Sequence, residues 1–353
     1  MGKRIAIVGV GAVGAYVGAH MARAGEDVTL IDPWPAHVEY MRANGLTVTH
    51  AKEVEPFTVP VRALHLTDLQ QLAKEAPVDI AFVCVKSYDT EWATTMIRQY
   101  LSPNGFVVSL QNCMNEERVA GVVGWGRTVG CIASKISVEL YDPGRVNRGA
   151  GKGGAKHTVF RAGEVHGRVT DRVEEVCRLV GLSDSAMVTT NLWGERWSKL
   201  VANSMQNGLS ACTGLSGNQM VGNDVIRRFS IRLGSEAVRV GQALGYVLED
   251  VLHIEPETLG RAGEGDAAAL KAAEDEMLAG AKGRADGQRP SMGQDMVKGR
   301  RTEIDFLNGF VVDRGASIGV AARANAALTD IVRRVERGEL KPDPKHITDL
   351  RLN

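Results

Sequence analysis

The chain has 353 residues, more than one hydrophobic core usually holds, so we expect two domains. Its 42 Lys and Arg residues balance 42 Asp and Glu residues, which gives no overall attraction for nucleic acid or an anionic membrane. No apolar run approaches the ~20 residues of a membrane span, and the five cysteines include no CxxC pair. These features predict a cytoplasmic protein with reduced cysteines that binds neither nucleic acid nor membrane and holds no metal.

A glycine motif follows the first apolar run of the chain. Residues 4–8 (RIAIV) have the composition of a buried parallel strand, and residues 9–14 then read GVGAVG before a small-residue helical pattern. In this spacing the first glycine permits a tight turn, the second lets the backbone approach a pyrophosphate, and the third allows the helix to pack on the strand. The residues expected to bind a dinucleotide here are Gly9, Gly11, Ala12, Val13 and Gly14.

The second strand-like run, DVTLID, ends on an acid. Asp32 lies 18 residues after the last glycine of the motif, near the position from which a carboxylate accepts hydrogen bonds from the ribose 2′-OH. The same charge repels a 2′-phosphate, and the nearest cation, Arg42, comes ten residues later. We therefore predict NAD as the preferred cofactor, with NADP left open as the alternative.

Strand-like runs alternate with helical segments up to residue 188. The strand-like runs cover 79–85, 106–111 and 128–134, the helical segments cover 90–101 and 166–182, a turn lies at 102–105, and a glycine-rich passage at 144–160 is expected to complete the sheet. This alternation predicts an α/β domain over residues 1–188 with a Rossmann-type, doubly wound parallel sheet. Ligands of such sheets bind beyond the carboxyl ends of the strands. Lys86 and Asn112 stand at two of these ends, where each is as consistent with an ordinary loop residue as with a ligand contact.

The sequence changes from strand-like to helical patterns near residue 188. Helices are predicted over 192–211, 224–245 and 302–319, so a mainly helical domain is expected over 189–353. Residues 256–289 are rich in Ala, Gly and charge. We interpret them as a solvated helical insertion, with a lid over a site as the alternative.

One predicted helix carries three polar groups on one side. Lys199, Asn203 and Asn207 follow one another at intervals of four residues, so a continuous helix places them on a single face. If these three polar side chains are buried among Leu and Met residues, they require hydrogen-bond partners, which another segment or a ligand must supply. Ser291 and Glu303 stand in a second polar segment, where on their own they suit a helix N-cap and a solvated first-turn acid.

The order of these motifs resembles the ketopantoate reductase (2-dehydropantoate 2-reductase) family. The resemblance rests on the glycine motif, Lys86, LQN at 110–112, the lysine and two asparagines of the 192–211 helix, and SMxQDxxxGRxTEID at 291–305. It extends from residue 4 to about residue 330. It implies a Rossmann-type domain followed by a mainly helical substrate-binding domain. The implied site consists of Lys199 as catalytic lysine, Glu303 as an acid of the site, Asn203, Asn207 and Ser291 as substrate ligands, and Lys86 and Asn112 beside nicotinamide and substrate.

The resemblance implies an NAD(P)-dependent oxidoreductase acting on CH–OH groups, which interconverts a 2-oxo acid and a 2-hydroxy acid. Reduction of 2-dehydropantoate to pantoate is the first candidate. The family usually reads LQNGMG where this chain reads LQNCMN, with Cys113 and Asn115 in place of glycines. Asp32 also replaces a basic residue of the family. These departures favour a related branched or aromatic acid and NAD.

Two other functions stay open at this stage. One is an NAD-dependent dehydrogenase of another secondary alcohol or hydroxy acid in a catabolic pathway, since the fold alone does not select the substrate. The other is a nucleotide-sensing protein without catalysis, although a sensor has no use for Lys199, Asn203, Ser291 and Glu303 together. Assembly as a homodimer is left open.

Overall fold

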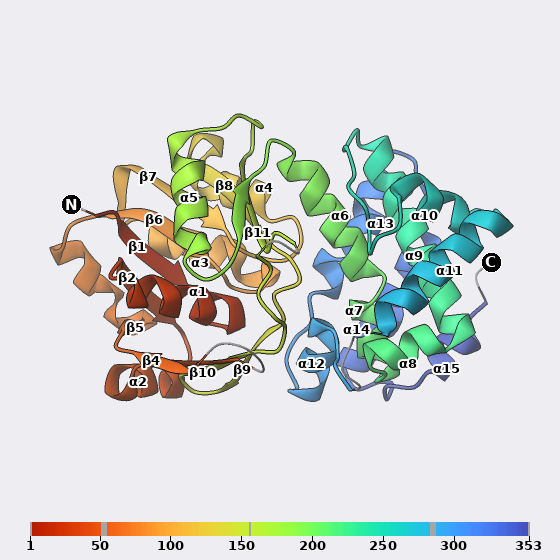
Figure 1. Ribbon diagram of the computed structural model, residues 1–353, viewed down its shortest axis with the longest axis horizontal. Helices are drawn as coiled ribbons and strands as arrows, with labels where there is room; N and C mark the ends of the chain where they lie inside the picture. Colours follow the sequence, from red (N-terminus) through yellow and green to blue (C-terminus); the bar gives the residue numbers. More distant parts are fainter. Residues whose placement is uncertain (1, 51–54, 155–156, 283–286, 352–353) are drawn as a thin grey trace. The chain divides into compact units, whose positions relative to one another are not determined.

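An eight-stranded sheet forms the centre of the first half of the chain (Figure 1). Its order is β12-β11-β8-β7-β6-β1-β2-β5, and every neighbouring pair is parallel except β11 with β8. The order runs outward in both directions from β1, which confirms the predicted doubly wound sheet. The strands are β1 (Arg4–Val8), β2 (Asp27–Asp32), β5 (Arg62–His65), β6 (Val78–Val83), β7 (Leu101–Ser109), β8 (Thr128–Ala133), β11 (Phe160–Glu164) and β12 (Ala186–Val188).

This computed structural model describes residues 2–50, 55–154, 157–282 and 287–351. The chain divides into two units, Met1–Leu192 and Trp193–Asn353. The sequence places the change of character near residue 188, and the division into units falls at the start of helix α6 (Leu192–Ser204).

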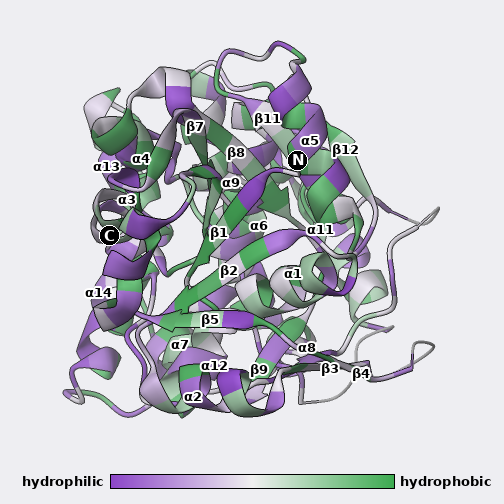
Figure 2. Cartoon of the chain, turned by 90° about the vertical axis from the view of Figure 1, so that its left-hand side faces the viewer, coloured by the Kyte–Doolittle hydropathy of each residue, from purple (hydrophilic) through white to green (hydrophobic). Residues whose placement is uncertain are grey.

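The central strands are buried on both faces, as alternating side chains show. Ile5 and Ile7 of β1 join a core that includes residues of α1 (Ala12–Arg23) and α5 (Asp171–Gly181). Ala6 and Val8 join a core on the opposite face with residues of α3 (Thr90–Arg98) and α4 (Glu116–Val123). Figure 2 shows β1 and β2 as hydrophobic along most of their lengths. Helices on both faces are typical of a parallel sheet.

A second sheet of four strands, in the order β4-β3-β10-β9, was not predicted. Its strands are β3 (Leu46–His50), β4 (Phe57–Val59), β9 (Val138–Asp142) and β10 (Arg145–Arg148). The prediction that 144–160 completes the main sheet is wrong for β10, which pairs with β3; only Phe160, the last residue of that passage, enters the main sheet, as the start of β11. Residues 102–105, predicted as a turn, lie within β7 at a shift in its register with β6.

The described part of the second unit consists of helices joined by turns and irregular segments, with one isolated bridge, which confirms the predicted mainly helical region. Its further helices are α7 (Asn207–Thr213), α8 (Gly217–Gly222), α9 (Asp224–Ala243), α10 (Pro256–Gly263), α11 (Ala267–Ala281), α12 (Ser291–Val297), α13 (Asn308–Ser317), α14 (Arg323–Glu336) and α15 (Lys345–Thr348). The predicted helix over 302–319 is a short 3₁₀ turn, η4 (Ile304–Phe306), followed by α13. Among the described residues, no helix combines the length and hydrophobicity needed to cross a membrane.

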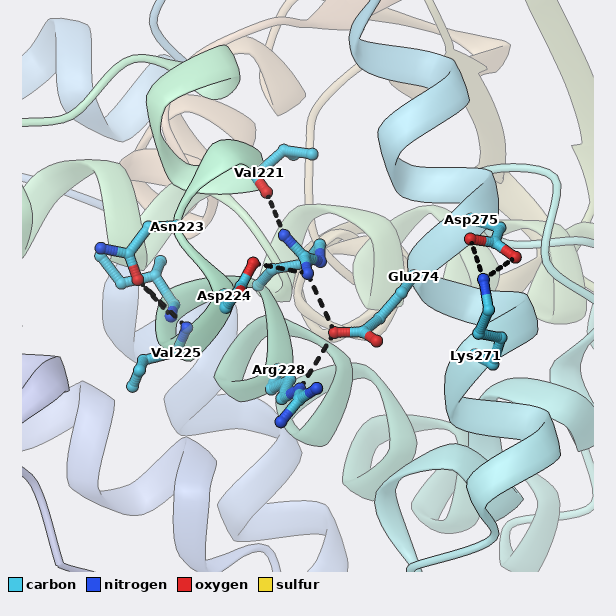
Figure 3. A network of polar contacts seen from close by, with 10 residues as sticks. Val221, Asn223, Asp224, Val225, Arg228, Lys271, Glu274 and Asp275 are labelled. Carbon is cyan, nitrogen blue, oxygen red and sulfur yellow. Dashed lines mark hydrogen bonds and ion pairs between the residues drawn. The ribbon is translucent and has the colours of Figure 1, made fainter.

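Residues 256–289 are helical in their described part, as predicted, but they are not simply solvated. Leu259, Ala273 and Met277 are buried on the inner sides of α10 and α11. Charge also fixes α11, because Glu274 accepts hydrogen bonds from Arg227 at 3.1 Å and from Arg228 at 3.0 Å (Figure 3). The two helices are therefore an integral part of the packing of this unit.

Candidate functional site

The glycine motif forms the turn between β1 and α1. Gly9 has φ +91°, and a Cβ there would lie 2.7 Å from Val85 Cγ1, so both conformation and space require glycine. A Cβ at Gly14 would collide with the carbonyl oxygen of Gly9. Gly11, in contrast, is exposed, and a Cβ there would meet no atom within 4 Å. Since packing does not demand a glycine at this position, the open space in front of α1 fits a ligand that approaches the backbone, such as a pyrophosphate.

Asp32 ends β2 and is bonded to the glycine turn. Its Oδ2 accepts the Val10 N–H at 2.7 Å and its Oδ1 accepts the Trp34 N–H at 2.9 Å. The side chain is buried, with 8% of the residue exposed. A carboxylate has about four acceptor positions, so two N–H donors leave capacity for ribose hydroxyls.

Arg42 is committed to its own protein. Its guanidinium donates to the Ala63 carbonyl at 2.9 Å, to Glu39 at 2.9 Å and to Asp68 at 2.5 Å. The hydrogen bond that Arg42 donates to Asp68 is the largest cause of the raised pKa of Arg42. Because three acceptors already engage this side chain, it is not arranged to receive a 2′-phosphate.

His37 is a residue of this region that the sequence did not indicate. It is completely buried, and its Nδ1 accepts the Gly144 N–H at 2.8 Å. Its Nε2 must therefore carry the proton that it shares with the Val10 carbonyl at 2.9 Å. Burial lowers the pKa of His37, which favours this neutral form. The glycine turn is thus held from both sides, by Asp32 at the Val10 N–H and by His37 at its carbonyl.

Lys86 and Asn112 stand beyond the carboxyl ends of β6 and β7, and two buried amides join their loops. Asn115 Nδ2 donates to Ser87 Oγ at 3.0 Å and to the Asn112 carbonyl at 2.8 Å. Gln111 Nε2 donates to the Val85 carbonyl at 2.8 Å. The structure therefore brings these two loops together, as the sequence predicts for neighbouring strand ends.

The helix predicted over 192–211 is broken, which corrects the expected single polar face. α6 ends at Ser204 and α7 begins at Asn207, so Lys199 and Asn203 share a helix that Asn207 does not continue. The Ser204 hydroxyl bonds back to the Val201 carbonyl at 2.8 Å, a contact that often bends helices.

Other helices bind the carbonyls that this break releases. The Ser204 carbonyl accepts from Asn308 Nδ2 at 3.0 Å, and the Met205 carbonyl accepts from Ser230 Oγ at 2.8 Å. Since unpaired carbonyls at a buried helix end are costly, Asn308 and Ser230 fix the break in place. Serine and asparagine before Gly208 were the available sequence signal for such a break.

Asn207 and Ser291 meet in the second unit. Asn207 Nδ2 donates to Ser291 Oγ at 3.2 Å. The close approach of α12 to α7 depends on Gly293, where a Cβ would collide with Ser210 Oγ. The prediction of Ser291 as a helix N-cap is wrong, because Pro290 occupies that position and Ser291 is the first helical residue. Two predicted substrate ligands are therefore neighbours.

Glu303 is buried, with 4% of the residue exposed, so the interpretation as a solvated acid is wrong. Its neighbours hold it. The backbone N–H of Thr302 donates to Glu336 at 2.8 Å. Ile304 packs against Gly208, where an added Cβ would lie 3.1 Å from Ile304 Cδ1. The segment carrying Glu303 thus contacts α7 at Gly208, the residue that follows Asn207.

Among the described residues, no group of three or more His, Cys, Asp or Glu side chains is arranged to hold a metal ion. All five cysteines are free thiols.

A doubly wound sheet with a glycine turn at its switch point, followed by a helical unit with grouped polar side chains, defines a two-domain dinucleotide-dependent enzyme.

Comparison with known proteins identifies the family. The family model described as "Ketopantoate reductase PanE/ApbA" matches residues 5–158. The model of the family's C-terminal region matches residues 191–336. The chain therefore belongs to the ketopantoate reductase family and is a nicotinamide-dependent oxidoreductase acting on CH–OH groups.

Individual relatives match along nearly their whole length. The 2-dehydropantoate 2-reductase of Archaeoglobus fulgidus is 29% identical over 95% of this chain and 99% of its own. The structure of a PanE/ApbA family ketopantoate reductase from Ralstonia eutropha JMP134 has a TM-score of 0.76 and 26% identity, covering 96% of this chain and 99% of its own. D-mandelate dehydrogenase, solved with NADH and anilino(oxo)acetate, shares the fold with a TM-score of 0.77 at 20% identity, covering 95% and 99% of the two chains.

Proposed function

We propose that this protein interconverts a 2-oxo acid and the corresponding 2-hydroxy acid, with Lys199 as the proton donor in reduction. The observation that carries the proposal is the contact of Asn207 with Ser291 at 3.2 Å, at the helix break that follows the turns bearing Lys199 and Asn203. An amide and a hydroxyl at that contact suit a carboxylate and a hydroxyl of a small acid.

The chemistry requires a proton and stabilisation of negative charge. A bound reduced nicotinamide would supply the hydride for the carbonyl carbon of the 2-oxo acid, and the carbonyl oxygen would become an alkoxide. The Lys199 ammonium stabilises the growing charge and transfers its proton to that oxygen, which gives the neutral hydroxyl of the product. Glu303, a buried carboxylate, is assigned to the same site as its acid.

The remaining polar groups are assigned to binding. Asn203, Asn207 and Ser291 hold the carboxylate and hydroxyl groups of the substrate. In the first unit, the glycine turn at 9–14 and Asp32 hold the dinucleotide, and Lys86 and Asn112 lie at its nicotinamide end.

NAD is proposed as the preferred cofactor. Asp32 presents a carboxylate at the end of β2, and Arg42, the nearest cation in the following helix, is already bound to three acceptors. The relatives named 2-dehydropantoate 2-reductase make 2-dehydropantoate the first substrate to test. Cys113 and Asn115 occupy positions where the family usually has glycine, which supports a related branched or aromatic 2-oxo acid as the second.

A substrate panel tests this proposal directly. Branched and aromatic 2-oxo acids are supplied with NADH or NADPH, and the matching 2-hydroxy acids with NAD or NADP, while absorbance of the reduced nicotinamide is followed. We expect turnover of at least one 2-oxo acid with NADH. Secondary alcohols that lack a carboxylate are tested in the same panel, and their turnover with none of the acids active would overturn the proposal.

A further inference from the structure

A fully buried amide ties together the two loops at the carboxyl ends of β6 and β7. Asn115 has no exposed surface, and its Nδ2 lies 3.0 Å from Ser87 Oγ and 2.8 Å from the Asn112 carbonyl oxygen. One amide group thus uses both of its N–H donors on different loops. Ser87 follows Lys86 directly, so the link fixes the corner from which Lys86 projects relative to the backbone of Asn112.

Gln111 makes a second link between the same loops. Its Nε2 donates to the Val85 carbonyl at 2.8 Å and to Thr90 Oγ1 at 2.8 Å. Thr90 in turn donates to the Ser87 carbonyl at 2.9 Å. Because Ser87, Thr90 and Gln111 are buried, loss of a donor among them leaves acceptors that water does not easily reach.

The backbone between Asn112 and Asn115 has an uncommon conformation. Cys113 has φ +64°, in the left-handed region that non-glycine residues adopt at a cost in free energy. This turn brings the Asn115 side chain back to the carbonyl of Asn112, three residues earlier. The hydrogen bonds of Asn115 therefore hold a loop conformation that Cys113 by itself disfavours.

We propose that Asn115 is a positioning residue, which holds Lys86 and Asn112 in the relative arrangement that binds the nicotinamide end of the cofactor. The proposal rests on the proposed function in one respect, the assignment of Lys86 and Asn112 to that end. Asn115 acts through Ser87 and the Asn112 carbonyl, while its Oδ1 accepts a long hydrogen bond from Arg118 Nη1 at 3.5 Å. The family usually has glycine at this position, where the Asn115 side chain donates two hydrogen bonds.

The test uses an isosteric variant. Asn115→Asp keeps the shape of the side chain but replaces both N–H donors by an oxygen that repels the Asn112 carbonyl. Dissociation constants for NADH are measured by quenching of protein fluorescence, KM and kcat on an active 2-oxo acid, and melting temperature in parallel. We expect the dissociation constant and KM for NADH to rise roughly tenfold.

Two further variants keep the result interpretable. Ser87→Ala removes one of the two bonds and is expected to raise the dissociation constant by a smaller factor; in a double variant with Asn115→Asp the effects should not add. Asn44→Ala is the matched control, because Asn44 is an exposed amide that donates only locally, to the Tyr40 carbonyl at 3.2 Å. It should leave cofactor binding unchanged.

The outcomes separate the two proposals. The contrary outcome is that both Asn115→Asp and Ser87→Ala lower the melting temperature while the dissociation constant and KM for NADH stay within about twofold of wild type. That result would show a structural role only and would overturn the positioning role. Ser87→Ala alone decides if Asn115→Asp does not fold. A wild-type protein that binds NADH but reduces no 2-oxo acid overturns the proposed function, while NADH affinity still tests Asn115.

Discussion

Asp32 Oδ2 lies 2.7 Å from the backbone nitrogen of Val10, so the acid at the end of β2 is bonded to the middle of the glycine turn. The same carboxylate accepts the Trp34 N–H at 2.9 Å. Asp32 therefore shapes the glycine turn, and we propose that its remaining acceptor positions bind a ribose of the cofactor.

Cofactor preference follows from this arrangement. Wild-type protein is expected to have a higher kcat/KM with NADH than with NADPH by roughly ten- to a hundredfold, the range for hydrogen bonds to a charged group. Asp32→Arg should reverse the direction of preference and also lower the free energy of unfolding, since Val10 and Trp34 lose their acceptor. Steady-state kinetics with both cofactors and urea unfolding measure these effects. Equal or better efficiency of the wild type with NADPH would contradict the assignment.

Lys199→Ala is expected to lower kcat by ~10²–10⁴, the usual range for a positioned proton donor. NADH affinity, measured by fluorescence quenching, should remain, because the cofactor-binding residues belong to the first unit. Lys341→Ala, at an exposed lysine of the second unit, to which Lys199 also belongs, serves as the control. If the folded Lys199 variant turns over near the wild-type rate, another group must donate the proton.

The contact between Asn207 and Ser291 predicts coupled effects on substrate binding. Asn207→Ala and Ser291→Ala should each weaken transition-state binding by roughly 1–3 kcal/mol, the cost of an unpaired polar partner. The double variant should lose less than the sum, because the two residues share one hydrogen bond. Values of kcat/KM for all four proteins give the coupling. Full additivity would show that the contact has no role in binding the substrate.

His20 makes stability depend on pH. Its ring packs on Tyr16 and Phe57, with ring centroids 4.8 and 5.0 Å away, its Nε2 has no hydrogen-bond partner, and burial lowers its pKa from 6.5 to about 3. Below about pH 6.5, His20 is therefore protonated in the unfolded chain but not in the folded chain. The contribution of His20 to the free energy of unfolding is fully present above that pH and is lost as the pH falls toward 3.

His20→Phe is expected to make this pH dependence shallower. Each pH unit in that window removes up to about 1.4 kcal/mol from the free energy of unfolding of the wild type. Urea unfolding between about pH 7 and pH 4.5 should thus show a gap of roughly 2–3 kcal/mol opening in favour of the variant. Parallel curves for the two proteins would show that His20 does not carry the effect.

Glu274 is expected to stabilise the docking of α11. Glu274→Gln leaves Arg227, which is 7% exposed, without a charged partner in α11, and should lower the free energy of unfolding by about 1–3 kcal/mol. Asp275→Asn is the matched control on the same helix, because its bond to Lys271 is exposed and i,i+4 pairs contribute only about 0.3–0.5 kcal/mol (Figure 3). Equal losses in the two variants would contradict the importance of burial.

The sequence by itself determined the class of fold and the glycine turn. Both depend on local patterns: apolar runs of strand length, glycines at fixed offsets, and an acid at the next strand end. Gly9 and Gly14 have the tight contacts that the motif predicts, and Asp32 lies at the turn, because strand β1, its turn and β2 are neighbours in sequence as well as in space.

Only the tertiary structure decided how the polar groups are held. The break between α6 and α7 exists because Asn308 and Ser230, about a hundred and about 25 residues away, bind the released carbonyls. His37 is locked by Gly144, 107 residues later, through a second sheet whose β3–β10 pairing no local pattern encodes. Hydrogen bonds between distant segments override helix periodicity, because a buried carbonyl or amide must find a partner wherever the fold places one.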